Sequence, residues 1–597
     1  MVYWTYGQYR PAALGPNPSP TLRQRSAAIC SKAGTKHRCT RKVGLLQYGT
    51  CKAKPASRVA RRCGVEWARL YPDAPDTRKA KAETRTVTDK DQHPLIPVSP
   101  GSLTRTIDGP HGILARMSSD VLEIVRVKDR ALEQARFRIG DYKFRGPDYR
   151  QILRWAEALG RSPEDVVEAL SGTQTKTVLA GVVEFSVVDG CILSLVWDFA
   201  KLPLDVFTWE DGLRIHTLAY QTKPPSGRLP RTFPSCLNTL CCESMGLEEL
   251  DLSDVPGLTS LSCGGNQLTE LDLSDVPGLT SLYCWGNQLT ELDLSDVPGL
   301  TWLSCWGNQL TDLDLSDVPG LTELYCGKNQ LTDLDLSGVP GLTWLGCDGN
   351  QLTNLDLSGV PGLASLGCDD NQLADLDLSD VPGLKSLFCW RNKLTDLDLS
   401  DVPGLTSLSC GGNQLTELDL SGVPGLTWLG CDGNQLTDLD LSGVPGLTLL
   451  HCWGNQLTDL DLWNVPGLTE LQCWENQLTD LDLSGVPKLT KLHCWGNQLT
   501  DLDLSGVPKL TELYCGGNQL TDLDLSGVPK LTELCCGENQ LTDLDLSGVP
   551  WLTLLSCGEN QLTDLDIRPL KNLECLGVDA HVQIIGTPPE SCIIERR

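Results

Sequence analysis

Cysteine returns at a fixed spacing of 21 residues through the second half of the chain, and this period limits the possible folds more than any other feature. Fifteen cysteines follow one another without an insertion: Cys263, Cys284, Cys305, Cys326, Cys347, Cys368, Cys389, Cys410, Cys431, Cys452, Cys473, Cys494, Cys515, Cys536 and Cys557. An asparagine stands three residues after each of them, from Asn266 to Asn560. A repeat of constant length builds a solenoid, in which every repeat is one coil that packs on its neighbours.

Two irregular units flank the regular ones. LNTLCCESMGLEELDL has Cys242 in register but Met245 at the asparagine position, and LECLGVDAH has Val578 and His581 in place of the cysteine and asparagine. Terminal repeats of a solenoid are atypical because they cap its core. We therefore expect a mainly β solenoid of about 16–17 coils. Its regular repeats span residues 237–566, and residues 567–597 form a C-terminal cap.

The repeat reads L-T-x-L-x-C-x-x-N-Q-L-T-x-L-D-L-S-x-V-P-x. Apolar and other residues alternate around the cysteine and again around L-D-L, which predicts two short extended segments per coil, joined by two turns. Parallel strands of neighbouring coils would then lie about 4.8 Å apart. Asparagine can both donate and accept hydrogen bonds in a buried turn. The V-P-x-L turn is expected to be type I, because later repeats place Lys488, Lys509, Lys530 and Trp551 after the proline.

The stretch L-x-x-L-x-C-x-x-N-x-L resembles the leucine-rich repeat signature, with cysteine in place of one leucine. The whole unit is similar to the bacterial nested-period subclass, in which half-units of 10 and 11 residues alternate. RLPRTFPSCLNTLCC is similar to the segment that leads into such repeats. The resemblance covers roughly residues 190–585. It implies a non-catalytic scaffold that binds a partner through the variable positions of its strands.

The residues before the repeats predict a small α+β segment. PDYRQILRWAEAL and SPEDVVEAL predict two helices within residues 147–172, with Ser162 as N-cap and Pro163 at the first helical position. VVEFSVVDGCILSL predicts a hairpin that turns at Asp189 and Gly190. We expect residues 117–189 to cap the solenoid and residues 190–236 to form degenerate repeats.

Charge divides the chain sharply. Residues 1–116 hold 21 basic and 7 acidic residues, a net charge of +14, and we expect them to be disordered or a non-native extension. Residues 237–597 hold 12 basic and 54 acidic residues, a net charge of −42. The sequence lacks a signal-peptide pattern and an apolar run long enough to span a bilayer. Together with the many cysteines this favours a cytoplasmic, monomeric protein without membrane contact. An exported effector without a cleavable signal peptide is the alternative.

The cysteines are expected to be packed core residues rather than disulfide-bonded or metal-binding residues. A thiol two residues after a buried leucine points inward, and free cysteine packs as a small apolar side chain. A straight column offers neither disulfide geometry nor converging zinc ligands. The predicted structural core therefore includes one cysteine and one asparagine from each coil, and no metal or cofactor is expected. Its first members are Cys263, Cys284, Cys305, Cys326, Asn266, Asn287, Asn308 and Asn329.

Aromatic side chains fill the outward positions around the cysteines, where contiguous exposed patches mark interaction sites. The predicted partner-binding residues are Tyr283, Trp285, Trp302, Trp306, Tyr325, Trp344, Phe388, Trp390, Trp428, Trp453, Trp474, Trp495 and Tyr514. The competing interpretation is cross-strand stacking that only stabilises the sheet. The leading hypothesis is a protein-interaction scaffold that binds an unidentified protein partner.

Two other functions remain open. The acidic column of the L-D-L-S segment, with Asp272, Asp293 and Asp314, could bind cations, mimic nucleic acid or bind basic proteins, although a solvated face is the simpler interpretation. ILRWAEALGRSPEDVVEALSG has a weak helix-turn-helix pattern, but residues 117–236 carry no net charge, so nucleic-acid binding is not expected. An enzyme activity would have to reside in residues 117–236.

Overall fold

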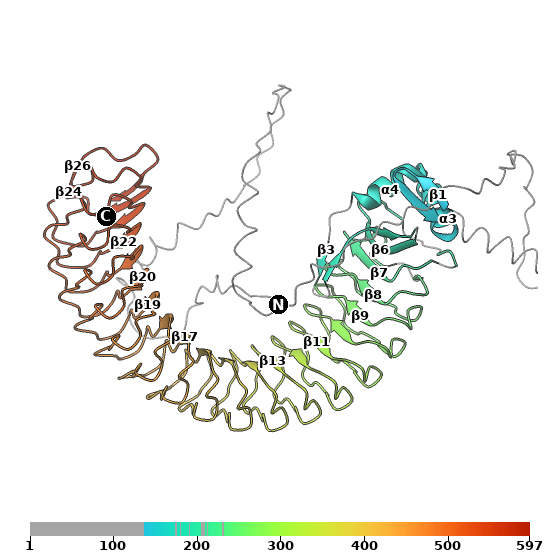
Figure 1. The fold of residues 1–597 in the computed structure, drawn as a ribbon, viewed down its shortest axis with the longest axis horizontal. Helices are drawn as coiled ribbons and strands as arrows, with labels where there is room; N and C mark the ends of the chain where they lie inside the picture. Colours follow the sequence, from blue (N-terminus) through green and yellow to red (C-terminus); the bar gives the residue numbers. More distant parts are fainter. Residues whose placement is uncertain are drawn as a thin grey trace, which may run out of the picture. The chain divides into compact units, whose positions relative to one another are not determined.

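The computed structural model describes residues 136–172, 176–178, 181–189, 191–204, 209–211, 213–229 and 232–596. The basic segment 1–116, and the disorder expected for it, lie outside these residues. Within the described part, 21-residue coils follow one another along an arc, with the strands on its inner side (Figure 1).

A small helical segment precedes the coils. The hairpin strands β1 (Arg136–Ile139) and β2 (Tyr142–Arg145) lead into helices α3 (Gly146–Leu159) and α4 (Pro163–Ser171). Ser162 caps α4: its hydroxyl accepts a hydrogen bond from the Asp165 N–H, while the Asp165 carboxylate accepts one from the Ser162 N–H. Trp155 of α3 packs edge-on against Trp197, with ring centroids 5.0 Å apart. Both predicted helices and the predicted N-cap at Ser162 are confirmed.

The chain then joins the long sheet through a hairpin. Strands β3 (Lys176–Val178) and β4 (Gly181–Val183) pair with each other. Strands β5 (Ser186–Val188) and β6 (Cys191–Asp198) are antiparallel, as predicted, and Asp189 at their turn has a φ of 50°. Strand β7 (Thr217–Gln221) continues the sheet in parallel with β6. The residues predicted as degenerate repeats thus contribute strands to the same sheet as the regular ones.

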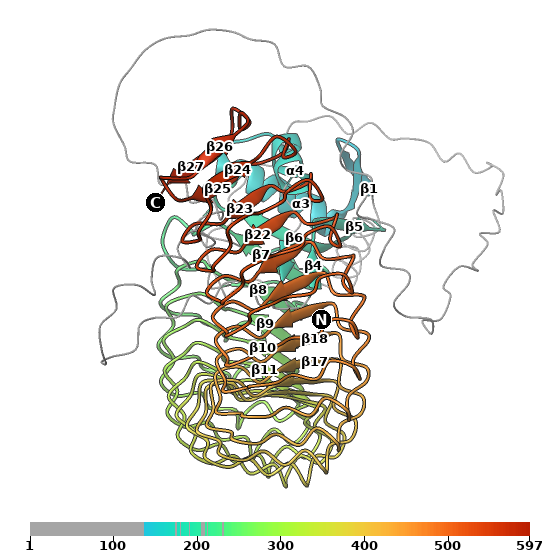
Figure 2. The same ribbon diagram turned by 90° about the vertical axis from the view of Figure 1, so that its left-hand side faces the viewer.

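Each regular coil adds one three-residue strand, and every strand is parallel to the last with a register of 21 residues, as in Leu282 opposite Leu303. The strands are β8 (Thr239–Cys241), β9 (Ser260–Ser262), β10 (Ser281–Tyr283), β11 (Trp302–Ser304), β12 (Glu323–Tyr325), β13 (Trp344–Gly346), β14 (Ser365–Gly367), β15 (Ser386–Phe388), β16 (Ser407–Ser409), β17 (Trp428–Gly430), β18 (Leu449–His451), β19 (Glu470–Gln472), β20 (Lys491–His493), β21 (Glu512–Tyr514), β22 (Glu533–Cys535) and β23 (Leu554–Ser556). Strands β25 (Cys575–Val578) and β27 (Ile593–Arg596) end the sheet. Figure 2 shows the ladder from the side.

The second extended segment predicted for every coil does not pair as a strand in most of the regular coils that the structure describes, although its residues alternate between buried and exposed as expected. The L-D-L segment pairs as a strand only near the C-terminal end, where β24 (Asp564–Asp566) lies beside β26 (Gln583–Ile585). Elsewhere the neighbouring coils share one backbone hydrogen bond near this segment, such as that from the Gln288 N–H to the Leu268 carbonyl, 2.8 Å. Coils on an arc are farther apart on its outer side, so the continuous strand ladder forms on the inner side.

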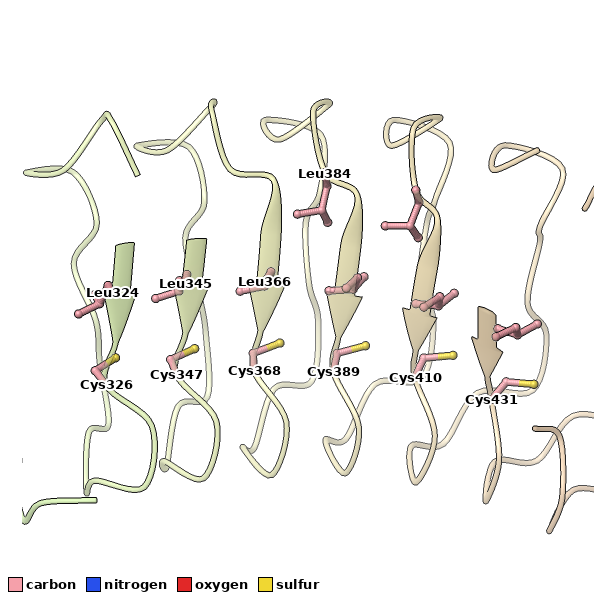
Figure 3. Close-up of a cluster of buried hydrophobic side chains, with 14 of the residues drawn as sticks. Leu324, Cys326, Leu345, Cys347, Leu366, Cys368, Leu384, Cys389, Cys410 and Cys431 are labelled. Atoms are coloured by element: carbon pink, nitrogen blue, oxygen red, sulfur yellow. The ribbon is translucent and has the colours of Figure 1, made fainter. Parts of the chain in front are cut away.

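The core runs through the coils as parallel rows of leucine and cysteine (Figure 3), with a further row of valines. Every cysteine of the 21-residue column has a relative exposure of 0%, as do the central strand leucines such as Leu324 and Leu345. A full column of small thiols between leucines allows short coils to close without voids.

Two turns close each coil. The Leu279 N–H donates to the Val276 carbonyl, 3.0 Å, and Gly278 has no positive φ, which confirms the predicted type I turn. The other turn requires a positive φ at the residue before the asparagine, as at Gly286 (φ 63°). Glycine adopts this conformation freely, but Glu475 must adopt it too, with a φ of 51°.

Candidate partner-binding surface

The strand side of the sheet carries the variable residues. In each strand the central leucine points into the core, so the residues before and after it, and the residue after the cysteine, line the inner side of the arc. We call these three columns the strand-side surface. All thirteen predicted partner-binding residues belong to them.

The buried cysteines do not contribute reactive groups to this surface. Burial raises the pKa of the Cys305 and Cys452 thiols to about 12, so both are protonated at neutral pH. All cysteines in the described part of the chain are free thiols. A protonated, buried thiol is neither a nucleophile nor a metal ligand.

An asparagine ladder holds the turn beside the cysteines. The Asn287 side chain donates to the carbonyl of Cys284 in its own coil, 3.0 Å, and to that of Cys263 in the preceding coil, 3.1 Å. Its oxygen accepts from the Leu268 N–H, 3.1 Å. The same set recurs at Asn308, Asn329 and the later asparagines. At the end of the ladder, the Asp579 carboxylate accepts from the Glu559 N–H, 2.9 Å, where another coil would follow.

Four aromatic side chains form a continuous row, which we call the N-terminal row: Tyr283, Trp302, Tyr325 and Trp344. Neighbouring ring centroids lie 5.8, 5.5 and 6.0 Å apart, with interplanar angles of 43°, 28° and 32°. The rings are tilted rather than coplanar because they alternate between the first and third strand positions. Aromatic contacts of this length stabilise the row by about 0.5–1.5 kcal/mol each.

Exposure rises toward the end of this row. Tyr283 is 5% exposed, so the expectation that it is an outward contact residue is wrong: neighbouring rings cover it. Trp344 is 41% exposed, because the next coil presents only Ser365 and Gly367 beside it. The large indole of Trp344 therefore lies next to a surface formed by small residues.

Three tryptophans at the position after the cysteine form a second cluster, the tryptophan stack: Trp453, Trp474 and Trp495. Their centroids lie 4.2 and 4.5 Å apart, and the rings are almost parallel, at 5° and 10°. The faces of Trp474 are thus covered by its neighbours, and all three side chains are half-buried. This arrangement matches the competing interpretation, in which stacking stabilises the sheet.

The other predicted residues are also half-buried on the strand side. Lys328 lies over Trp306, 4.6 Å from the ring centroid, and Arg391 over Trp390, 3.9 Å. Phe388 and Trp428 approach to 5.8 Å across an intervening coil, and Trp285 packs over Gly264. Tyr514 stacks on His493, with centroids 4.3 Å apart, and its hydroxyl donates to Glu533, 2.6 Å.

Charged pairs occupy the strand side next to the tryptophan stack. His451 Nε2 lies 3.3 Å from Glu470 Oε1, and this hydrogen bond holds the Glu470 pKa at about 2. Burial lowers the pKa of His493 to about 4, so its ring is neutral at pH 7. The sequence places these residues in neighbouring coils, but only the register shows that His451 meets Glu470 diagonally.

The acidic column on the opposite side has a local structural role. The Ser274 N–H donates to Asp272 Oδ1, 3.0 Å, and Asp293 and Asp314 accept from Ser295 and Ser316 in the same way. Hydrogen bonds from the Ser274 side chain and backbone lower the pKa of Asp272 and keep it charged. Each carboxylate thus closes an Asx turn while staying exposed. No group of three or more potential metal ligands converges anywhere in the described ranges.

Two of the most exposed tryptophans were not among the predicted site residues. Trp463 is 70% exposed and Trp551 is 60% exposed, and both lie in the S-x-V-P-x turn rather than on the strand side. The sequence did contain a signal, because they replace the serine and the glycine that other repeats have there. Helices long and apolar enough to cross a membrane are absent from the described residues.

These coils, with one parallel strand, a leucine core and an asparagine ladder, define a short-repeat solenoid. The family described as Leucine Rich repeats (2 copies) matches residues 298–338, 466–506 and 508–548. The functional domain of InlJ from Listeria monocytogenes, which includes a cysteine ladder, is 38% identical, with 51% of this chain and 68% of that one covered and a TM-score of 0.50. The chain belongs to the leucine-rich repeat family.

Two more distant structures share the fold. A leucine-rich repeat protein of Leptospira interrogans is 24% identical, with 55% of this chain and 92% of that chain covered and a TM-score of 0.52. The ectodomain of a plant membrane receptor kinase from Arabidopsis thaliana is 20% identical, with 67% and 57% covered and a TM-score of 0.54. No curated protein sequence matches the chain. Proteins with this fold are generally non-catalytic interaction modules.

Proposed function

We propose that the chain is a non-catalytic scaffold that binds a protein partner through its strand-side surface, with Trp344 as the central anchor. One observation carries the proposal: a 41% exposed tryptophan at the end of an aromatic row, beside the small residues Gly346, Ser365 and Gly367. An indole exposed to water is unfavourable. The space left by the small residues beside Trp344 can accept an apolar side chain of a partner, which would pack against the indole.

The N-terminal row gives this anchor a rigid support. Trp302 packs on Tyr325, and Tyr325 packs on Trp344, so less side-chain entropy is lost when a partner binds than for an isolated tryptophan. Trp302, Trp306 and Tyr325 extend the contact area as half-buried neighbours. The tryptophan stack contributes mainly to stability, because its rings cover one another.

The test is a pull-down with the full chain as bait, in which Trp344 is changed to Ser, the residue of Ser365 in the next coil. We expect the partner to be captured at least about tenfold more weakly, as for a hot-spot residue. Trp463→Ser is the matched control, because it also removes an exposed tryptophan and restores the residue usual for its position. It should leave capture unchanged.

The acidic surface is the competing explanation, and salt distinguishes the two. Capture that persists in the Trp344→Ser variant but disappears at about 0.5 M salt, where charges are screened within a few Å, would replace this proposal with binding through the exposed carboxylates. Equal loss in the Trp344→Ser and Trp463→Ser variants would also contradict a strand-side anchor.

A further inference from the structure

The S-x-V-P-x turn changes its charge along the solenoid. The first regular repeats read S-D-V-P-G, with Asp254, Asp275, Asp296 and Asp317. Three consecutive later repeats read S-G-V-P-K, with Lys488, Lys509 and Lys530, and the next reads S-G-V-P-W, with Trp551. All eleven preceding repeats have glycine after the proline. The acidic residue is already absent from several earlier repeats, such as those with Gly338 and Gly359, and none of the three lysine repeats carries it.

These three lysines form a row on one edge of the coils. They stand at the same position of three successive coils, whose strands stack about 4.8 Å apart. All three are exposed, and none has a carboxylate within 4.0 Å in the described part of the chain. Lys491 provides the contrast, because its Nζ lies 3.1 Å from Glu512. We call Lys488, Lys509 and Lys530 the lysine row.

The lysine row ends at an exposed indole and a shallow hollow. Trp551 is 60% exposed, and the hollow beside it is lined by Lys530, Thr532, Trp551, Thr553, Asn572 and Glu574. The hydroxyls of Thr532 and Thr553 donate to backbone carbonyls of the preceding coils, at 3.0 and 3.1 Å, which fixes the floor. The lysine column continues through Trp551 to Asn572, and the Glu574 carboxylate enters the hollow from the neighbouring threonine column, one coil after Thr553.

The fold does not require these residues. The type I turn is made equally by glycine in eleven other repeats, so neither lysine nor tryptophan is needed to close the coil. Adjacent like charges repel each other, and an exposed indole leaves apolar surface in water. The solenoid has a net charge of −42, yet none of the three lysines forms an ion pair with its carboxylates within 4.0 Å in the described residues. An anionic partner bound along this edge would pair with all three exposed ammonium groups.

We propose that this edge binds an acidic peptide segment of a protein partner. Its carboxylates lie along the lysine row, an apolar side chain packs on Trp551, and a free amino group or basic side chain reaches Glu574. The carboxylate at the far end favours such a polar sequence over a uniformly charged polyanion, which Glu574 would repel. This edge is separate from the strand-side surface around Trp344, so the two proposals can fail independently.

The test uses the full chain and a fluorescein-labelled synthetic peptide with a free amino terminus, one leucine and a run of four glutamates, measured by fluorescence anisotropy at about 50 mM salt. Lys488→Gly, Lys509→Gly and Lys530→Gly together restore the glycine of the other repeats. We expect this triple variant to bind on the order of tenfold more weakly, the effect of three exposed ion pairs. Trp551→Gly should weaken binding to a similar extent.

The matched control is a second triple variant, Lys328→Gly, Lys385→Thr and Lys393→Gln. It removes the same charge and also restores the residues usual at those positions in other repeats, so it should leave the affinity unchanged. A peptide with lysines in place of the glutamates can be attracted to the acidic solenoid elsewhere, so its binding should not be weakened by the lysine-to-glycine triple variant.

Three results would overturn the proposal. These are no binding of the acidic peptide to the unchanged chain, equal weakening by both triple variants, or tighter binding of polygalacturonate than of the peptide. The last result would assign the edge to an acidic polysaccharide instead.

Discussion

The N-terminal row and the tryptophan stack are built from similar residues in neighbouring columns of one sheet, yet their geometry differs. In the row, rings alternate between two strand positions and tilt by 28–43°, and the last one faces a coil with small residues. In the stack, every ring stands at one position, and the planes differ by 10° or less. The single column covers the faces of the middle ring, whereas the alternating row ends at Trp344 beside the small residues Ser365 and Gly367. Aromatic residues at strand positions can thus stabilise a solenoid or provide a contact surface, depending on register.

The largest expected difference between these regions is in stability. Trp474→Gly removes the middle ring and restores the residue found at this position in six other repeats; we expect a loss of about 3 kcal/mol in unfolding free energy. Trp344→Ser should cost less than about 1 kcal/mol, since that side chain is exposed. Urea denaturation followed by circular dichroism measures both. If Trp344→Ser lowers the unfolding free energy as much as Trp474→Gly does, the two aromatic clusters do not differ in their contribution to stability.

An intermediate effect concerns pH near the tryptophan stack. The pKa of His493 is lowered from its ordinary value of about 6.5 to about 4 by burial, so the folded state favours the neutral ring. The stability that this provides is fully present above about pH 6.5 and is lost as pH falls toward 4. His493→Gln uses the residue of Gln472 at the same position, and it should reduce the fall in melting temperature between pH 7 and pH 5 by a few degrees. If the fall in melting temperature between pH 7 and pH 5 is the same with and without His493, this residue does not titrate as described.

The smallest effect concerns the turn beside Trp474. Glu475 has a φ of 51°, which costs a non-glycine residue about 1 kcal/mol, so Glu475→Gly should stabilise the chain by up to about that amount. Gly454→Ala, at the equivalent position with a φ of 66°, should destabilise it. Thermal unfolding of the two variants provides the comparison, and a loss of stability in Glu475→Gly would contradict the assignment of strain.

Much of the fold could be predicted from the sequence because the relevant interactions repeat with it. The period of 21 residues implies parallel strands in register, and the alternation around the cysteines assigns the inner side correctly. The capping residues of α4 and the type I turn depend on neighbours in the chain, so they too were predictable.

Features that depend on neighbouring coils were harder to predict. The alternation of residues in the strand predicts that Tyr283 points away from the core leucines. Whether its ring is exposed depends on the next coil, where the Trp302 ring packs against it. The exposure of Trp344 likewise follows from Ser365 and Gly367, one coil further. The second strand fails to form because of the curvature of the coils, which no single repeat encodes.

The asparagine ladder has a consequence for how such a chain can change in length. The joints between the regular coils are alike: one asparagine amide donates to the cysteine carbonyls of its own and the preceding coil, and it accepts from a leucine N–H of the preceding coil. Whole units of 21 residues can therefore be duplicated or deleted without a mismatched joint, whereas a partial unit would leave buried backbone groups unpaired. Each added coil would move Trp344 and the tryptophan stack apart by about 4.8 Å. The ladder thus makes the spacing between two surfaces adjustable in fixed steps while the joint itself stays constant.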